Sequence, residues 1–156
     1  MTLSATFSEW DRHCMELAIA AAERAAELGE VPVGAVIARD HQILSVAHNT
    51  LITQNDPTGH AEVLALREAA TVAANYRLPG ATLYVTLEPC TMCCGALIHA
   101  RIERLVFATP EPKAGAVIST LKVLDNPQLN HRVSVQHGLE QERASAQLSD
   151  FFRARR

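Results

Sequence analysis

The chain has 156 residues, of which 48% are hydrophobic and 20% charged. This composition is typical of a globular protein whose core is large enough to need no disulfide bonds, so we expect one domain over residues 1–156. The net charge of −3 argues against a general nucleic-acid-binding protein. No run of apolar residues approaches the roughly 20 needed to cross a bilayer, so we expect no membrane partner.

The N-terminus and the cysteines bear on the compartment. The opening sequence MTLSATFSEWDRHC lacks the basic region and the apolar run of a secretory signal. We therefore expect a cytoplasmic protein whose four cysteines are reduced or metal-bound rather than paired.

Several helices and strands can be placed in chain order. A first helix is predicted at residues 9–28, with Ser8 as its N-cap, an apolar stripe that reaches Leu28, and Gly29 as its end. The other predicted elements are a β-hairpin with strands at 33–38 and 43–47, a helix at 60–74, a strand at 81–87, a helix at 91–100, strands at 104–108 and 133–135, and a helix at 140–153. Strands that alternate with helices favour a partly parallel sheet covered on both faces, and the hairpin makes the sheet mixed. The sequence thus predicts an α/β fold, a three-layer α/β/α sandwich with a mixed central sheet.

Charge is unevenly distributed along the chain. Residues 1–80 hold five Lys/Arg against ten Asp/Glu, which gives −5, and residues 81–156 hold nine against seven, which gives +2. The chain closes on Phe151-Phe152-Arg153-Ala154-Arg155-Arg156, which could stack on bases and meet phosphates. The alternative is an amphipathic terminal helix whose arginines are solvated.

Two short segments, His60-Ala61-Glu62 and Pro89-Cys90-Thr91-Met92-Cys93, carry the candidate chemistry. Each begins a predicted helix, where unpaired N–H groups and the helix dipole favour thiolates and developing negative charge. His60, Cys90 and Cys93 offer three zinc ligands, and catalytic zinc sites use three protein ligands and keep a position for water. Glu62 is then a spare carboxylate that can carry a proton. The set predicts a hydrolytic zinc site that removes ammonia from an amidine-like carbon.

Two other interpretations of the Cys-x-x-Cys segment remain open. A redox pair would leave His60 and Glu62 without a role. A structural zinc site would need Cys94 or Cys14 as its fourth ligand. Cys94 follows Cys93 directly on a helix and points about 100° away, so we expect both Cys94 and Cys14 in the core.

The two segments match H-x-E…P-C-x-x-C, the signature of the zinc nucleobase deaminases. Other stretches make almost the whole chain resemble the bacterial tRNA-specific adenosine deaminases within that superfamily. They are Val31-Pro32-Val33-Gly34-Ala35-Val36, Asn49, Asp56-Pro57-Thr58-Gly59, Tyr76-Arg77-Leu78, residues 81–90, Asn130-His131-Arg132-Val133 and Ser149-Asp150-Phe151-Phe152-Arg153. The last two stretches are the more specific to the tRNA branch.

The resemblance implies a cytidine-deaminase-like fold and one zinc ion per chain, with Glu62 as the catalytic proton carrier. It implies conversion of the wobble adenosine of a tRNA anticodon to inosine, with the loop base splayed into the pocket. The partners would be the tRNA anticodon stem-loop and a second copy of the chain in a homodimer, and DNA is not expected as the natural substrate.

The resemblance also assigns substrate contacts. Asn49 would hydrogen-bond the adenosine, Phe152 and Arg153 would line the anticodon-loop side, and Lys113 would lie near the backbone. The segment 108–113 departs from the family pattern, because Pro110-Glu111-Pro112 stands where relatives usually have an Arg-Asp pair before the lysine. His48 and Gly59 are smaller departures, and none of the three belongs to the zinc set.

Two rival functions stay open on the sequence alone. A deaminase of a free base or nucleoside, of the cytosine or guanine type, would keep the zinc set without needing the basic C-terminal end. A non-catalytic zinc-containing RNA-binding subunit is disfavoured by Glu62, because a carboxylate that holds no metal has no role without catalysis.

Overall fold

A five-stranded mixed sheet lies at the centre of the computed structural model, which describes residues 6–156. The strands are ordered β2-β1-β3-β4-β5 across the sheet. Their bounds are β1 Gly34–Arg39, β2 Gln42–His48, β3 Thr82–Leu87, β4 Arg104–Thr109 and β5 Ser134–His137. β1 is antiparallel to both of its neighbours, while β3, β4 and β5 are parallel to one another. The predicted mixed sheet is confirmed.

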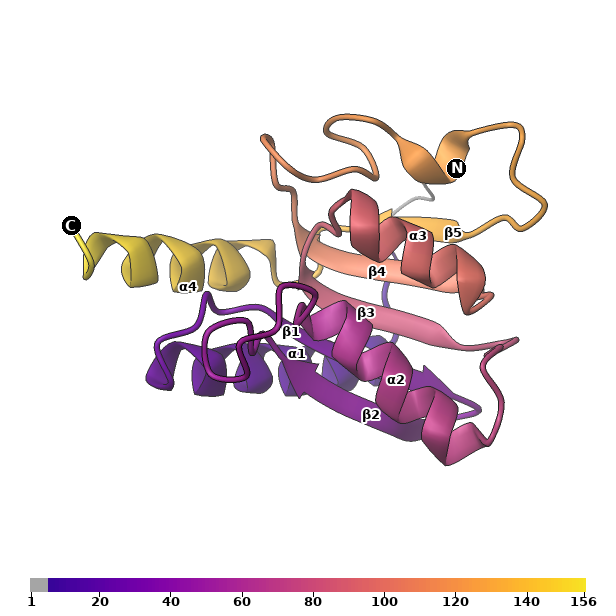
Figure 1. The fold of residues 1–156 in the computed structure, drawn as a ribbon, viewed down its shortest axis with the longest axis horizontal. Helices are drawn as coiled ribbons and strands as arrows, with labels where there is room; N and C mark the ends of the chain where they lie inside the picture. The colour runs from indigo at the N-terminus through magenta and orange to yellow at the C-terminus, as the bar shows by residue number, and fades with distance from the viewer. Residues whose placement is uncertain (1–5) are drawn as a thin grey trace.

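Helices cover both faces of this sheet (Figure 1). On one face lie α2 (Ala61–Ala73) and α3 (Thr91–His99), together with the short 3₁₀-helix η1 (Val123–Asp125). On the other lie α1 (Glu9–Glu27) and the start of α4 (Gln141–Arg153), whose far end extends past the sheet. The predicted three-layer α/β/α sandwich is therefore confirmed.

Each central strand contributes side chains to both layers of the core. On β3, Leu83 and Val85 pack under α2 and α3, while Tyr84 between them packs under α1. On β4, Phe107 faces the first layer and Val106 the second. Because successive side chains of a strand point to opposite faces, strands buried on both faces read as continuous apolar runs, and this made them recognisable in the sequence.

α1 lies very close to the sheet. A Cβ added at Gly34 would stand 1.9 Å from the carbonyl oxygen of Ala18, so only glycine allows this contact.

The helix α1 begins at a capping box, in which the Ser8 hydroxyl accepts a hydrogen bond from the Asp11 N–H and the Asp11 carboxylate accepts one from the Ser8 N–H, both at 3.0 Å. It ends one residue earlier than predicted, and Leu28 is 56% exposed because the chain turns there into Gly29 with φ of 80°.

A buried polar cluster ties α1 to the start of the parallel strands. The Asp11 carboxylate accepts hydrogen bonds from the Tyr84 hydroxyl at 2.6 Å and from the Arg104 guanidinium at 2.8 and 3.0 Å. Burial alone would raise the pKa of Asp11, but these bonds and the Ser8 N–H hold it well below its usual value. Arg104 is thus half-buried, and its Nε also donates to the Gln136 side-chain oxygen at 2.7 Å.

Smaller differences concern the hairpin and the last strand. β1 and β2 are joined by Asp40 and His41 alone, both with positive φ, so the turn is two residues shorter than the sequence suggested. His41 stacks on Trp10 at a ring-centroid distance of 5.0 Å. Strand β5 begins one residue later than predicted and ends at His137. Among residues 6–156, no helix is long and apolar enough to cross a bilayer.

Candidate metal centre and base pocket

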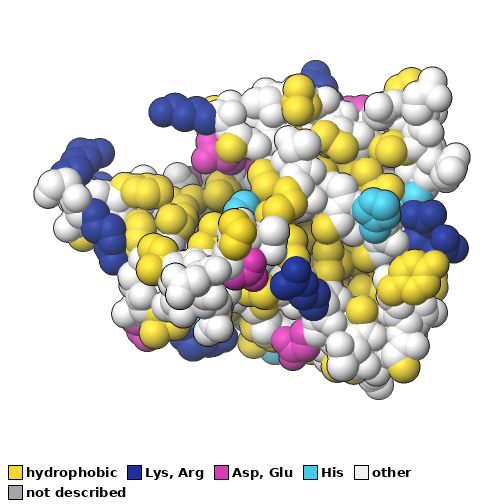
Figure 2. Space-filling view, viewed as in Figure 1, with side chains coloured by type: hydrophobic (Ala, Val, Ile, Leu, Met, Phe, Trp, Pro, Cys, Tyr) yellow, Lys and Arg dark blue, Asp and Glu magenta, His cyan; other side chains and the backbone are white. Residues whose placement is uncertain are grey.

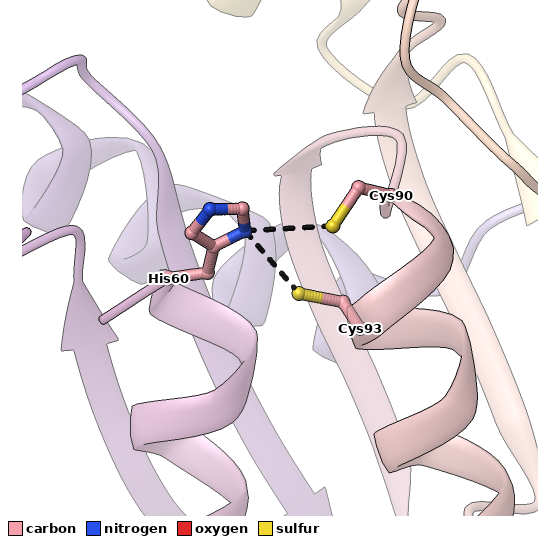
Figure 3. Close-up of side chains that lie close together, drawn as sticks. All are labelled: His60, Cys90 and Cys93. Atoms are coloured by element: carbon pink, nitrogen blue, oxygen red, sulfur yellow. Dashed lines mark hydrogen bonds between the residues drawn. The ribbon is translucent and has the colours of Figure 1, made fainter. Parts of the chain in front are cut away.

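The starts of α2 and α3 bring three potential metal ligands together. His60 and Cys90 are the N-cap residues of these helices, and both have extended backbone conformations. His60 Nδ1 lies 3.6 Å from Cys90 Sγ and 3.5 Å from Cys93 Sγ (Figure 3). The three donor atoms all lie within 4.8 Å of one another, so the group could hold a metal ion.

The electrostatics of the cluster favour a thiolate at Cys90, whereas the hydrogen bond to Cys90 and burial raise the pKa of the Cys93 thiol. The Cys93 thiol and the His60 ring both donate toward the Cys90 sulfur and lower the pKa of Cys90 to about 3. Cys94, in contrast, is fully buried in the core, and desolvation raises the pKa of its thiol to about 12. Cys14 is buried in the other core layer. Both cysteines therefore lie in the core, as expected, and neither is part of the metal cluster.

Glu62 lies in the first turn of α2 and is only 4% exposed. Burial raises the pKa of its carboxyl to about 7, against the opposing effects of its own backbone N–H and of the nearby His60. A carboxyl group that changes protonation near neutral pH can both accept and return a proton. Glu62 faces the same pocket as His60 and Cys90.

Asn49 holds the first turn of α2 in place. Its Oδ1 accepts a hydrogen bond from the Ala61 N–H at 2.9 Å, and its Nδ2 donates to the Val31 carbonyl oxygen at 3.1 Å. Ala61 directly follows His60, so Asn49 contributes to the placement of that ligand. Asn49 also lines the pocket and is 7% exposed.

A pocket of about 230 Å³ opens above the cluster. Sites that enclose whole drug-sized ligands measure roughly 300–1,000 Å³, so this pocket suits one base rather than a nucleotide. Its lining comes from both helix starts, the ends of strands and the loops beside them: Val31, Val33, Asn49, Leu51, His60, Glu62, Leu87, Glu88, Cys90, Glu111 and Ala114. It lies beyond the carboxyl ends of the parallel strands, where ligands bind in open α/β sheets.

A larger groove of about 540 Å³ continues from this pocket toward the C-terminus. Val31, Leu87 and Glu111 line both, so the two are contiguous. The far wall belongs to α4 and includes Phe152, which is 50% exposed, and Arg153, which also pairs with Asp150 at 3.1 Å. Figure 2 shows hydrophobic side chains in the hollow beside α4 and Lys or Arg side chains at its end.

Two further parts of the site are the C-terminal end of α4 and the loop around Pro110-Glu111-Pro112, which differs from the family pattern. Phe151 is buried, and the Arg155 guanidinium lies 3.5 Å from the centroid of its ring. The Glu111 carboxylate accepts a hydrogen bond from the Lys113 N–H at 2.8 Å. Lys113 itself is exposed and does not line the pocket, whereas Glu111 and Ala114 of the same loop do.

Two buried carboxylates that the sequence analysis missed hold the loops around the pocket. Glu30 accepts hydrogen bonds from the Ile52 N–H at 3.2 Å and the Thr53 N–H at 2.7 Å. Glu88 accepts five hydrogen bonds from the loop that follows β4. Burial opposes ionisation in both, yet these donors lower the pKa of each carboxyl. Glu88 could have been recognised in the sequence as an acidic residue directly after a buried strand, whereas no sequence pattern marks Glu30 as a buried carboxylate.

Comparison with known proteins agrees with this arrangement. Residues 9–156 match the family model of MafB19-like deaminases. The chain is 48% identical to a tRNA-specific adenosine deaminase of Haemophilus influenzae, over 96% of this chain and 87% of the relative. It is 47% identical to a tRNA-specific adenosine deaminase of Aquifex aeolicus, over 89% and 91%.

Solved structures show the same relationship. A structure from a study of A-to-I editing by tRNA:A34 deaminases at the wobble position of transfer RNA is 43% identical, with a TM-score of 0.85 over 87% of this chain and 99% of that chain. A guanine deaminase of Nitrosomonas europaea is 19% identical, with a TM-score of 0.72 over 97% of this chain and 86% of that chain, and shares the fold.

Proposed function

The chain belongs to the family of tRNA-specific adenosine deaminases, and from this premise we propose that it converts the wobble adenosine of a tRNA anticodon to inosine by hydrolytic deamination. One observation supports this most directly. The three-ligand cluster of His60, Cys90 and Cys93 lies beside the buried Glu62 at a pocket the size of one base. We propose a single zinc-dependent deaminase domain over residues 1–156.

The donor set suits zinc, one ion per chain. With Zn–S of about 2.3 Å and Zn–N of about 2.0–2.1 Å, tetrahedral ligands stand about 3.6 Å apart from nitrogen to sulfur. The corresponding distances here are 3.5 and 3.6 Å. When bound, zinc supplies a Lewis acid that lowers the pKa of a water molecule. Mass spectrometry of the metal-replete protein should find about one zinc per chain and its loss in His60→Ala.

Glu62 carries the proton in this proposal. Its carboxylate accepts one proton from the attacking water and delivers it to a ring nitrogen of the adenine, then accepts the second proton from the hydroxyl group that the attack leaves on the ring carbon and delivers it to the departing amine. The raised pKa of about 7 matches this double task at neutral pH. Helix starts on two sides of the pocket favour the negative charge that develops during attack.

Asn49 and the groove supply the substrate contacts. Oδ1 of Asn49 already accepts from the Ala61 N–H, and its Nδ2 carries a second hydrogen that can reach a base in the pocket. Phe152 offers an exposed ring for stacking, and Arg153 a cation for a phosphate. Lys113, exposed at the other wall, can meet the RNA backbone. The double variant Phe152→Ala/Arg153→Ala should weaken stem-loop binding while zinc content stays unchanged.

A homodimer is the proposed assembly. Figure 2 shows hydrophobic side chains over the face formed by α2 and α3, and large exposed side chains there include Val72 of α2 and Met92 of α3. Exposed apolar patches of this kind mark interaction surfaces. Sedimentation should find a dimer at micromolar concentration, and a monomer would contradict this part of the proposal. We propose the cytoplasm as its compartment, because the proposed substrate is a tRNA.

The decisive experiment offers the zinc-loaded protein an anticodon stem-loop with a wobble adenosine, the same stem-loop with that adenosine replaced by guanosine, free adenosine, cytosine and guanine. Inosine at the wobble position alone supports the proposal. Deamination of a free base without action on the stem-loop would assign the free-base function instead. Stem-loop binding without any deamination would indicate a non-catalytic RNA-binding subunit.

A further inference from the structure

The loop over residues 110–122 forms one wall of the pocket without any helix or strand of its own. Glu111 and Ala114 of this loop face the pocket. A wall of this kind needs other contacts to keep its shape, because an irregular segment gains no repeating hydrogen bonds. Five of those contacts converge on one side chain, Glu88.

The Glu88 carboxylate is 3% exposed and joins the two ends of the loop. Its Oε1 accepts from the Glu111 N–H at 2.9 Å and the Ser119 hydroxyl at 2.5 Å. Its Oε2 accepts from the N–H groups of Val117, Ile118 and Ser119 at 3.0, 2.8 and 3.0 Å. Hydrogen bonds to an ionised acceptor are about twice as strong as neutral ones, so this carboxylate is a strong anchor for the loop.

The loop packs closely against the carboxylate. A Cβ added at Gly115 would lie 2.3 Å from Cδ and 2.4 Å from Oε1 of Glu88, and 2.6 Å from the Glu111 carbonyl oxygen. Glycine is therefore required at this position by the close approach of the carboxylate. The Ala116 N–H donates to the Pro89 carbonyl oxygen at 2.8 Å, which ties the loop to the residue before Cys90.

We propose that Glu88 is a positioning residue of the deaminase site, whose carboxylate holds residues 111–119 as a preformed wall for the substrate base. The proposal rests on the proposed function for its substrate. Glu88 acts through Glu111 and Ala114 rather than by proton transfer. When the wall is already ordered, RNA binding does not have to offset the conformational entropy lost on ordering the loop. Loss of the Glu88 contacts should therefore weaken RNA binding rather than slow the chemical step.

The test is Glu88→Gln, which keeps the shape and leaves one acceptor oxygen. The Oε2 position serves three N–H groups, so we expect the amide oxygen there and the NH₂ group at the Oε1 position, opposite the Glu111 N–H. Hydrogen exchange should become faster at Glu111 and change little at Val117–Ser119. KM for the anticodon stem-loop should rise about tenfold, with kcat within about threefold and zinc content unchanged.

Gly115→Ala disturbs the contact between the loop and Glu88 but leaves the charge of the carboxylate in place, and it should also raise KM. Asp11→Asn is the matched control, because it weakens a buried carboxylate cluster at the opposite end of the strands. It should lower stability and leave KM as it is.

An unchanged KM in both Glu88→Gln and Gly115→Ala would overturn the proposal, and so would a loss of kcat alone or an equal KM rise in Asp11→Asn. If the unaltered protein leaves the stem-loop unmodified, the proposed function fails and the substrate part of this proposal with it. The exchange rates at Glu111 still decide separately whether Glu88 holds the wall.

Discussion

Asn49→Ala tests how the first turn of α2 is held next to the metal centre. The substitution leaves the Ala61 N–H without a partner, while the Val31 carbonyl oxygen keeps the hydrogen bond from the Val33 N–H at 2.9 Å. A buried group without a partner costs about 1–3 kcal/mol. Water from the adjoining pocket can reach this site, so we expect the lower part of that range, about 1–2 kcal/mol. With a urea slope of about 2 kcal/mol/M, the unfolding midpoint should fall by about 0.5–1 M.

The measurement is urea unfolding at a fixed free zinc concentration, because a ligand that binds only the folded state adds to its stability. Zinc affinity, measured by chelator competition, should also fall by about tenfold, since Ala61 follows the ligand His60. Asn75→Ala is the matched control, because Asn75 makes one exposed hydrogen bond beyond the other end of α2 and should cost less than about 1 kcal/mol. Equal losses in the two variants would refute the argument.

Three further outcomes are expected. Glu62→Gln should lower wobble deamination by about 10²–10⁴-fold with zinc retained, because an amide cannot carry the proton; unchanged turnover would remove Glu62 from its role. Asp11 has a lowered folded pKa, so its stabilisation is complete above about pH 5 and is lost as the pH falls through the unfolded pKa of about 3.9. The stability difference between wild type and Asp11→Asn should therefore shrink from about pH 5 to pH 3 in urea unfolding. Gly34→Ala should lower thermal stability severely through its clash with α1, whereas Gly95→Ala, which meets open space in α3, should raise it by about 0.5–1 kcal/mol.

The helices, the strands and the metal-ligand cluster could be predicted because their signals lie in short stretches of sequence. Strands buried on both faces appear as apolar runs, and α1 carries a capping box at Ser8 and a glycine after its last turn. The three ligands could be grouped because His60 and Cys90 each precede a predicted helix in a fold whose helix starts meet at one sheet edge.

Contacts that join distant segments were not predictable. Nothing near Arg104 in the sequence shows that it reaches Asp11, 93 residues earlier. Glu88 and Glu30 bind backbone N–H groups of loops, and such donors belong to every residue except proline and therefore leave no residue pattern. Leu28 fitted the apolar spacing of α1, but spacing alone cannot show where the sheet beneath a helix ends.

The helix that carries the proposed RNA contacts is fastened to a different layer from the helices that hold the metal ligands. α4 is attached to α1 through Arg143, which pairs with Glu16, and through Gln147, whose Nε2 donates to the Ile19 carbonyl oxygen at 3.0 Å. The ligands instead depend on α2 and α3, across the sheet. Substitutions on the groove side of α4 can therefore change which RNA is accepted while the catalytic apparatus stays intact. The residues that select the RNA can therefore change during evolution, although the metal ligands and Glu62 cannot.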